Sequence, residues 1–181
     1  MVSGAPAMAA LVATFAIVAV QRVAELRVAK RHQAWALQNG GRLIEEPHYW
    51  MFFVLHTGWL FAWLAEAWLR GPALATLWPA YVGAFVLAGF VRYWAITSLG
   101  ERWNTKIIVF DGLAPVRRGP YRFLNHPNYL VVAVELACVP LIFDAWITAA
   151  ACSVLNAALL LGLRIPAEMK AMAEAAGAPT P

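Results

Sequence analysis

The sequence predicts an all-α protein that crosses a membrane about five times. Of its 181 residues, 62% are hydrophobic and only 13% are charged, and the mean hydropathy is +0.62. Soluble domains average about 25% charged residues, so this composition is typical of a membrane protein. Nine tryptophans and five tyrosines suit the two membrane–water interfaces, where amphipathic aromatic rings collect. We expect a single domain over residues 1–181.

Five apolar runs are candidate spans, because a helix needs roughly 20 mostly apolar residues to cross the hydrocarbon core. In chain order they are residues 2–20, 49–69, 73–99, 129–143 and 145–163. The short fourth run and the fifth predict a C-terminal helical hairpin that turns at Asp144. An amphipathic continuation of the first helix should end at Asn39-Gly40-Gly41, and a new amphipathic helix should begin at Pro166.

The distribution of basic residues predicts the orientation in the membrane. Twelve of the 14 Lys and Arg residues follow the first, third or fifth span, on one side of a five-span protein. By the positive-inside rule, a multi-pass protein of the cell membrane with this pattern has its N-terminus outside and its C-terminus in the cytoplasm. The net charge of +4 therefore reflects topology, and we expect no nucleic-acid partner. Cys138 and Cys152 lie in apolar runs, which indicates small buried thiols.

A polar, basic and aromatic run precedes the C-terminal hairpin: Gly119-Pro-Tyr-Arg-Phe-Leu-Asn-His-Pro-Asn-Tyr129. Pro120 and Pro127 prevent it from forming one uninterrupted helix. Pro127 fits the first position of a new helix, which would leave free N–H groups beside His126 and suit an anion or a cofactor carboxylate. From the residues alone, this run is either an ordinary loop at the membrane surface or the edge of a site built there.

Three ionisable residues lie inside the predicted spans: His56, Arg92 and Glu135. Such groups are costly within a bilayer and by default indicate function. As structural alternatives, Arg92 could extend to the cytoplasmic interface, His56 could bond to a neighbouring helix, and Glu135 could pair with an arginine of the loop. Arg164 and Glu168 are four residues apart and share a helix face, either as part of a site or as a surface ion pair.

The motifs of soluble cofactor enzymes are absent from the sequence. It contains no G-x-G-x-x-G, P-loop, G-x-S-x-G, H-E-x-x-H or C-x-x-C. A site must therefore be assembled from the polar loop and the intramembrane polar residues, and we expect no metal in it.

The polar loop and the segment after it resemble a known family. The pattern is Gly119-x-Tyr121-x-x-x-x-His126-Pro127-x-Tyr129, preceded by Leu113 and Val116 and followed by a hydrophobic hairpin and Arg164-x-x-x-Glu168. It resembles the isoprenylcysteine carboxyl methyltransferase family, most strongly over residues 100–170. Further runs extend the resemblance to residues 20–170, towards a bacterial branch that includes alkylpyrone and alkylresorcinol O-methyltransferases. These runs are His48-Tyr49, Leu55-His56, Arg92-Tyr93-Trp94, Trp103 and Lys106-Ile107-Ile108.

The resemblance implies a membrane enzyme that uses S-adenosyl-L-methionine to methylate a lipophilic acceptor arriving from the bilayer. Its cofactor-binding residues would be Leu113, Val116, Gly119, Tyr121, His126, Pro127, Tyr129 and Glu168. The candidate catalytic residues are Arg164, Glu168 and His56. Arg164 would orient a carboxylate acceptor, whereas a hydroxyl acceptor, which the bacterial branch favours, would need a base such as His56 or Glu135. Asn125 and Met169 depart from the family, which usually has an arginine and a second glutamate there.

Two other hypotheses stay open at this point. One is a membrane lipid or sterol-type reductase that uses NADPH, since some such reductases have a similar Arg-His-Pro-Asn-Tyr loop in much longer chains. The other is a non-catalytic membrane scaffold, in which the loop is merely solvated.

Overall fold

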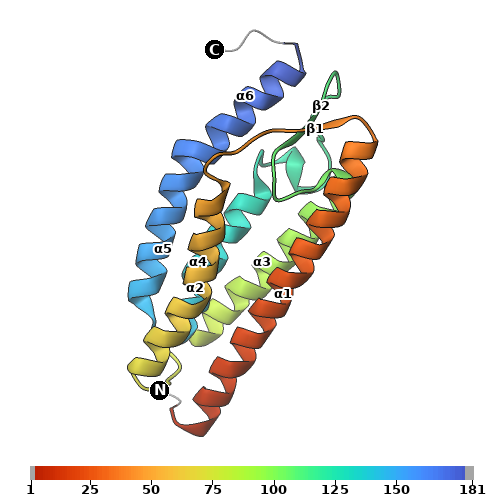
Figure 1. Ribbon diagram of the computed structural model, residues 1–181. Coiled ribbons are helices and arrows are strands. Elements are labelled where there is room, and N and C mark those ends of the chain that lie inside the picture. The colour runs from red at the N-terminus through yellow and green to blue at the C-terminus, as the bar shows by residue number, and fades with distance from the viewer. Residues whose placement is uncertain (1–2, 178–181) are drawn as a thin grey trace.

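The computed structural model describes residues 3–177, which form a bundle of helices with a small sheet at one end (Figure 1). The helices are α1 Ala5–Gln38, α2 Tyr49–Leu69, α3 Trp78–Leu99, α4 Pro127–Ile142, α5 Trp146–Leu159 and α6 Ile165–Ala175. The strands β1 (Gly41–Leu43) and β2 (Ile108–Phe110) pair antiparallel, with Arg42 opposite Val109. The expected start of the first span, Val2, lies outside the described residues.

Four helices within residues 3–177 are long and apolar enough to cross a membrane: α1, α2, α3 and the helix Trp146–Ala175 that continues from α5 into α6. The apolar helix α4 has 16 residues, about 24 Å of helix against a hydrocarbon core of about 30 Å. Large apolar side chains are exposed on the helices, among them Phe53, Phe90 and Leu161, as expected where lipid surrounds the protein. The prediction of an all-α protein with about five apolar helices, the last two in a hairpin, is confirmed.

Two predicted boundaries need correction, and a proline explains each. α3 begins at Trp78 and not at residue 73, because Pro79 is tolerated at the start of a helix but not in its interior. No new helix begins at Pro166, since α5 runs into α6 through a π-helical turn, Leu160–Arg164. There Ile165 N–H bonds to Leu160 O, five residues before it, so the helix widens just ahead of Pro166 and accommodates it.

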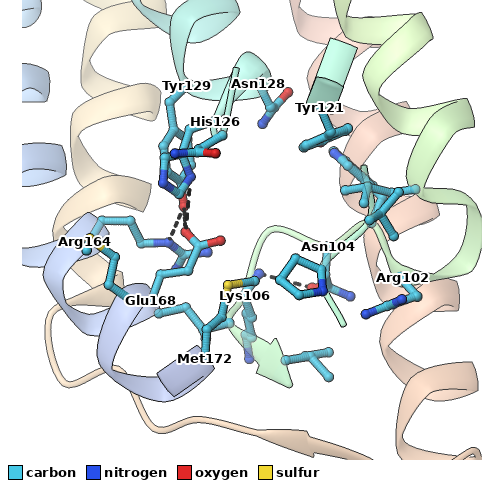
Figure 2. Close-up of a pocket in the computed structure, with 18 of the residues that line it drawn as sticks. Arg102, Asn104, Lys106, Tyr121, His126, Asn128, Tyr129, Arg164, Glu168 and Met172 are labelled. Carbon is cyan, nitrogen blue, oxygen red and sulfur yellow. Dashed lines mark hydrogen bonds and ion pairs between the residues drawn. The ribbon is translucent and has the colours of Figure 1, made fainter. Parts of the chain in front are cut away.

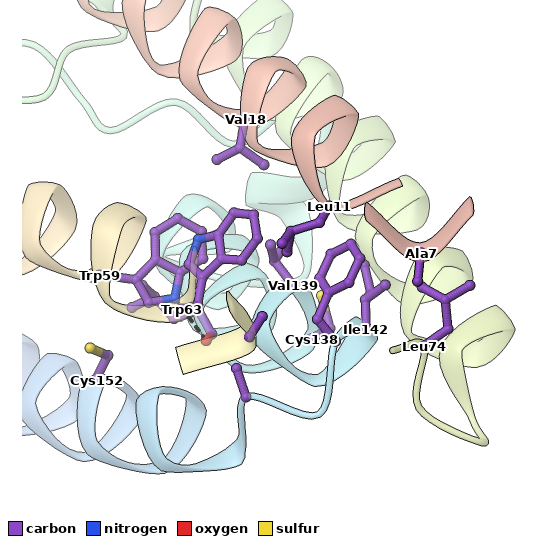
Figure 3. Packing of buried hydrophobic residues seen from close by; sticks show 14 of the residues in the cluster. Ala7, Leu11, Val18, Trp59, Trp63, Leu74, Cys138, Val139, Ile142 and Cys152 are labelled. Carbon is purple, nitrogen blue, oxygen red and sulfur yellow. Dashed lines mark hydrogen bonds between the residues drawn. The ribbon is translucent and has the colours of Figure 1, made fainter. Parts of the chain in front are cut away.

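The apolar core lies between α1, α2, α4 and α5 (Figure 3), at the end of the bundle away from the sheet (Figure 1). Trp59 and Trp63 are almost fully buried, and Trp63 stacks on Phe143 with 5.7 Å between ring centroids. The Trp59 indole donates its N–H to Leu136 O at 3.1 Å, which satisfies the polar atom of a buried aromatic side chain. This bond links α2 to α4 within the apolar core.

Between the apolar core and the sheet end of the bundle, four charged residues from three helices neutralise one another. Glu135 of α4 accepts hydrogen bonds from Arg92 of α3 and from Arg22 of α1, the latter at 2.6 Å. Glu25 accepts from Arg92 at 2.5 Å and from Arg22 at 3.0 Å. Buried charges persist only when paired. Arg92 therefore does not extend to the interface and Glu135 does not pair with a loop arginine, contrary to two of the structural alternatives.

Candidate functional site

Two cavities lie near the sheet end of the bundle, and we call them outer and inner. The outer cavity has a volume of about 410 Å³ and lies between α6, the first turn of α4 and the segment 99–126 (Figure 2). The inner cavity has a volume of about 230 Å³ and lies among α1 to α5. Ligand pockets usually measure about 300–1,000 Å³, so the outer cavity alone has room for a cofactor.

The two cavities share one wall. Five residues line both of them: Trp103, Asn104, Asn128, Tyr129 and Arg164. We call this set the junction. The junction is therefore where a molecule bound in the outer cavity would come closest to one bound in the inner cavity.

A chain of hydrogen bonds crosses the junction. Tyr129 donates its hydroxyl hydrogen to Glu168 Oε2 at 2.5 Å and accepts a bond from Arg164 Nε at 3.0 Å. The guanidinium of Arg164 also pairs with the Glu46 carboxylate and donates to Thr105 O at 2.9 Å. Arg164 is thus held by three separate segments and is only 8% exposed. Arg164 and Glu168 are joined through Tyr129, not as a surface ion pair.

His126 extends this polar chain into the outer cavity. Its ring stacks on Tyr129, with centroids 5.0 Å apart and planes 11° from parallel. Its Nδ1 lies 3.8 Å from Glu168 Oε2, and Figure 2 shows these side chains gathered on one side of the cavity. The helix α4 begins at Pro127, as predicted, so the positive end of its dipole faces the same space. The side chains of His126, Tyr129 and Glu168 and the N-terminal end of α4 therefore all face the outer cavity.

The loop that carries Tyr121 packs tightly against α3. Arg118 Nε donates to Ser98 O at 2.6 Å. Gly119 has a φ of 58°, and a Cβ added there would lie 1.9 Å from Ser98 Oγ, so only glycine fits. Tyr121 is held at the outer cavity across from Glu168. Burial raises the pKa of Tyr121, and the Glu168 carboxylate raises it further, so its hydroxyl stays neutral at physiological pH.

The structure brings most of the predicted site residues together. Those lining the outer cavity are Val116, Tyr121, His126, Tyr129, Arg164 and Glu168. Pro127 starts α4 without lining either cavity, and Leu113 is 57% exposed and lines neither. His56 lies in the wall of the inner cavity, where its Nδ1 has no hydrogen-bond partner, so the alternative that this atom bonds to a neighbouring helix is not met.

Other residues of the site were missed from the sequence. Asn128 lies within the predicted loop and could have been included, and Asn156 is the only amide in the apolar run 145–163. Glu46 and Asn104 gave no local signal, because they matter only through contacts with distant segments. Cys138 and Cys152 are buried and free, and within residues 3–177 no group of three His, Cys, Asp or Glu side chains could hold a metal ion.

These features define a multi-pass membrane protein with a two-cavity site near one end of its bundle. Residues 81–174 match the model of the isoprenylcysteine carboxyl methyltransferase (ICMT) family. The chain belongs to this family and is a membrane methyltransferase, so neither a reductase nor a scaffold is favoured. It is 38% identical over 159 residues to the uncharacterized protein YpbQ of Bacillus subtilis (strain 168), covering 88% of this chain and 94% of that protein. No solved structure matches it.

The close packing at Gly119 gives a test of the site's architecture. Gly119→Ala should lower the thermal unfolding temperature and increase hydrogen exchange in residues 116–126, because the new Cβ collides with Ser98 and the backbone is strained. Gly112→Ala is the matched control, since Gly112 has a φ of 72° but nothing within 4 Å of an added Cβ. Equal effects of the two substitutions would show that backbone strain alone matters and that the packing against α3 does not.

Proposed function

We propose that this protein is an S-adenosyl-L-methionine-dependent O-methyltransferase that methylates a hydroxyl group of a lipophilic acceptor, of the alkylresorcinol or alkylpyrone type. The observation that carries the proposal is the junction, where an outer cavity lined by the cationic Arg102, Lys106 and Arg117 and by Glu168 meets a more apolar inner cavity at five shared residues. Such a pair of cavities suits a polar methyl donor on one side and a lipid on the other. A carboxylate lipid is the alternative acceptor.

The donor set of the outer cavity fits the cofactor. Arg102, Lys106 and Arg117 line it with the single carboxylate of Glu168, so both ends of an amino-acid zwitterion find an opposite charge there. Bound in this cavity, the cofactor would supply an electrophilic methyl group on a sulfonium. Tyr129 and Trp103 present aromatic rings at the junction, where they stabilise such a cation through cation–π contact.

The inner cavity fits the acceptor. Phe52, Phe53, Leu60, Val132 and Leu160 form its apolar walls. Phe53 is also 62% exposed, so this wall extends to the surface of the bundle, where lipid would lie. An acceptor can thus enter from the bilayer with its oxygen at the junction, its head in the inner cavity and its chain extending past the apolar wall towards the bilayer. Positioning of this kind provides much of the rate enhancement for an in-line methyl transfer.

A hydroxyl acceptor must also lose a proton when its oxygen takes the methyl group. Glu25 and Glu135 are occupied by arginines, whereas His56 Nδ1 is free in the wall of the inner cavity. We therefore assign the proton to His56, which would take it directly or through one water. Arg164, at the junction, would stabilise the oxyanion that forms when the hydroxyl loses its proton, before the oxygen takes the methyl group.

Cofactor binding is tested by calorimetry on the detergent-solubilised protein. S-adenosylhomocysteine should bind, and NADPH should not. His126→Ala should weaken binding about tenfold, because it removes the ring stacked on Tyr129 beside Glu168. His48→Ala is the matched control, since His48 is exposed and lines neither cavity. Normal binding by the His126 variant would remove the polar loop from the cofactor site.

The acceptor is tested with labelled S-adenosyl-L-methionine and two lipids, an alkylresorcinol and a farnesylated cysteine analogue. The alkylresorcinol should be methylated, and His56→Ala should lower kcat by about 10²-fold or more, as expected for loss of a general base. The loss should shrink at alkaline pH, where the phenol ionises unaided. Thr57→Ala, a change in the same wall, serves as control. Methylation of the prenylcysteine alone, unaffected by His56→Ala, would overturn the hydroxyl assignment.

The proposed orientation places the protein in the cell membrane, with the C-terminus and the outer cavity in the cytoplasm and the N-terminus outside. The basic residues on the segment 102–122 support it. In a variant whose two native cysteines are replaced by alanine, Arg117→Cys should react with impermeant maleimide only in opened cells. Trp146 is the first residue of α5, at the end of the bundle away from the sheet, and is 53% exposed, so Trp146→Cys should react in intact spheroplasts. The reverse pattern would invert the topology.

A further inference from the structure

Unsatisfied polar atoms are concentrated on the inner cavity. Seven buried side-chain nitrogen or oxygen atoms within residues 3–177 have no hydrogen-bond partner, and five of them belong to residues that line this cavity. These five are Arg22 Nε, His56 Nδ1, Arg92 Nε, Asn128 Oδ1 and Asn156 Oδ1. Buried polar groups in proteins are nearly always bonded. Their concentration on one cavity indicates that a ligand satisfies them.

Asn156 lies deeper in the bundle than the junction. Asn156 on α5 and Val132 on α4 are equally far along the chain from the hairpin turn 143–145, so they lie at similar depth. Val132 is four residues beyond Asn128, a step of about 6 Å along a helix. Arg22 and Arg92 reach the same region, because both bond to Glu135 in the next turn of α4. A second polar layer, formed by Asn156, Arg22 and Arg92, therefore lies about one helical turn from the junction, on the side of the apolar core.

We propose that this layer is a second binding subsite, in which Asn156 binds another oxygen of the acceptor's head. The inference rests on the proposed function, in which the first oxygen lies at the junction and receives the methyl group. It defines the substrate class as lipids whose ring or enol head carries two oxygens. A lipid with a single hydroxyl would leave the subsite unsatisfied.

The chemistry of the subsite matches a neutral oxygen. Asn156 is 2% exposed, and its carboxamide offers an acceptor and two donors. Arg92 Nε adds a donor from the opposite wall. The neighbouring charges cancel, because Arg22 and Arg92 are both paired with carboxylates. A hydroxyl can donate to the amide oxygen and accept from a donor, whereas a carboxylate or phosphate would bring an uncompensated charge into the bilayer.

The subsite is tested by binding, without methyl donor, of two probes: an alkylresorcinol and the alkylphenol with the same chain. In nanodiscs, the wild-type protein should bind the alkylresorcinol about tenfold more tightly, because a site built to bond a hydroxyl rejects the analogue that lacks it. Asn156→Leu, of similar size, should abolish this preference by weakening only the alkylresorcinol. Asn156→Ser keeps a donor and an acceptor and should retain part of the preference.

Ser153→Ala is the matched control, since Ser153 Oγ is also buried without a partner on α5 but does not line the inner cavity. It should leave the ratio of the two affinities unchanged. Equal binding of both probes by the wild type, or an equal loss for both in Asn156→Leu, would overturn the subsite. Since no methyl transfer is involved, failure of the proposed function would appear separately, as absence of methylated product from either probe.

Discussion

The Arg164 guanidinium holds the site together. It is buried at the end of a π-helical turn and bonds to Glu46, Tyr129 and Thr105, which come from three segments outside its own helix. A buried guanidinium is tolerated only when its charge and its donors are satisfied. The loop before α2, the strand region and α4 must therefore all be in place before Arg164 can be buried. The junction between the cavities exists because this one charge requires those partners.

A second set of buried charges differs from Arg164 because it leaves hydrogen-bond donors free inside the bundle. Glu135 and Glu25 neutralise Arg22 and Arg92 within the bundle, while the Nε atoms of both arginines stay unbonded. The network thus supplies polarity to the inner cavity without net charge. In a bilayer this distinction decides which ligands can enter, since a neutral oxygen needs only hydrogen bonds whereas an ion needs a counter-charge.

Local features of the chain were predictable from the sequence, and distant contacts were not. The start of α4 at Pro127 follows from the fixed backbone angle of proline. By contrast, Glu46 meets Arg164 across 118 residues, and nothing in the sequence marks that pairing. The sequence predicts a helix boundary at Pro166, and the prediction is wrong because a π turn, which relieves the clash of proline, leaves no clear sequence pattern.

The junction also explains how one small bundle can hold two different ligands at a fixed distance from each other. The inner cavity is formed between packed helices, two of which are linked by the bond from Trp59 to Leu136. The outer cavity is formed by a loop anchored on Ser98 of α3 and by α6. α4 belongs to both, since Tyr129 lies in its first turn and Val132 in the next. A rigid helix shared by both cavities fixes the distance between donor and acceptor, and that distance is what an in-line transfer requires most.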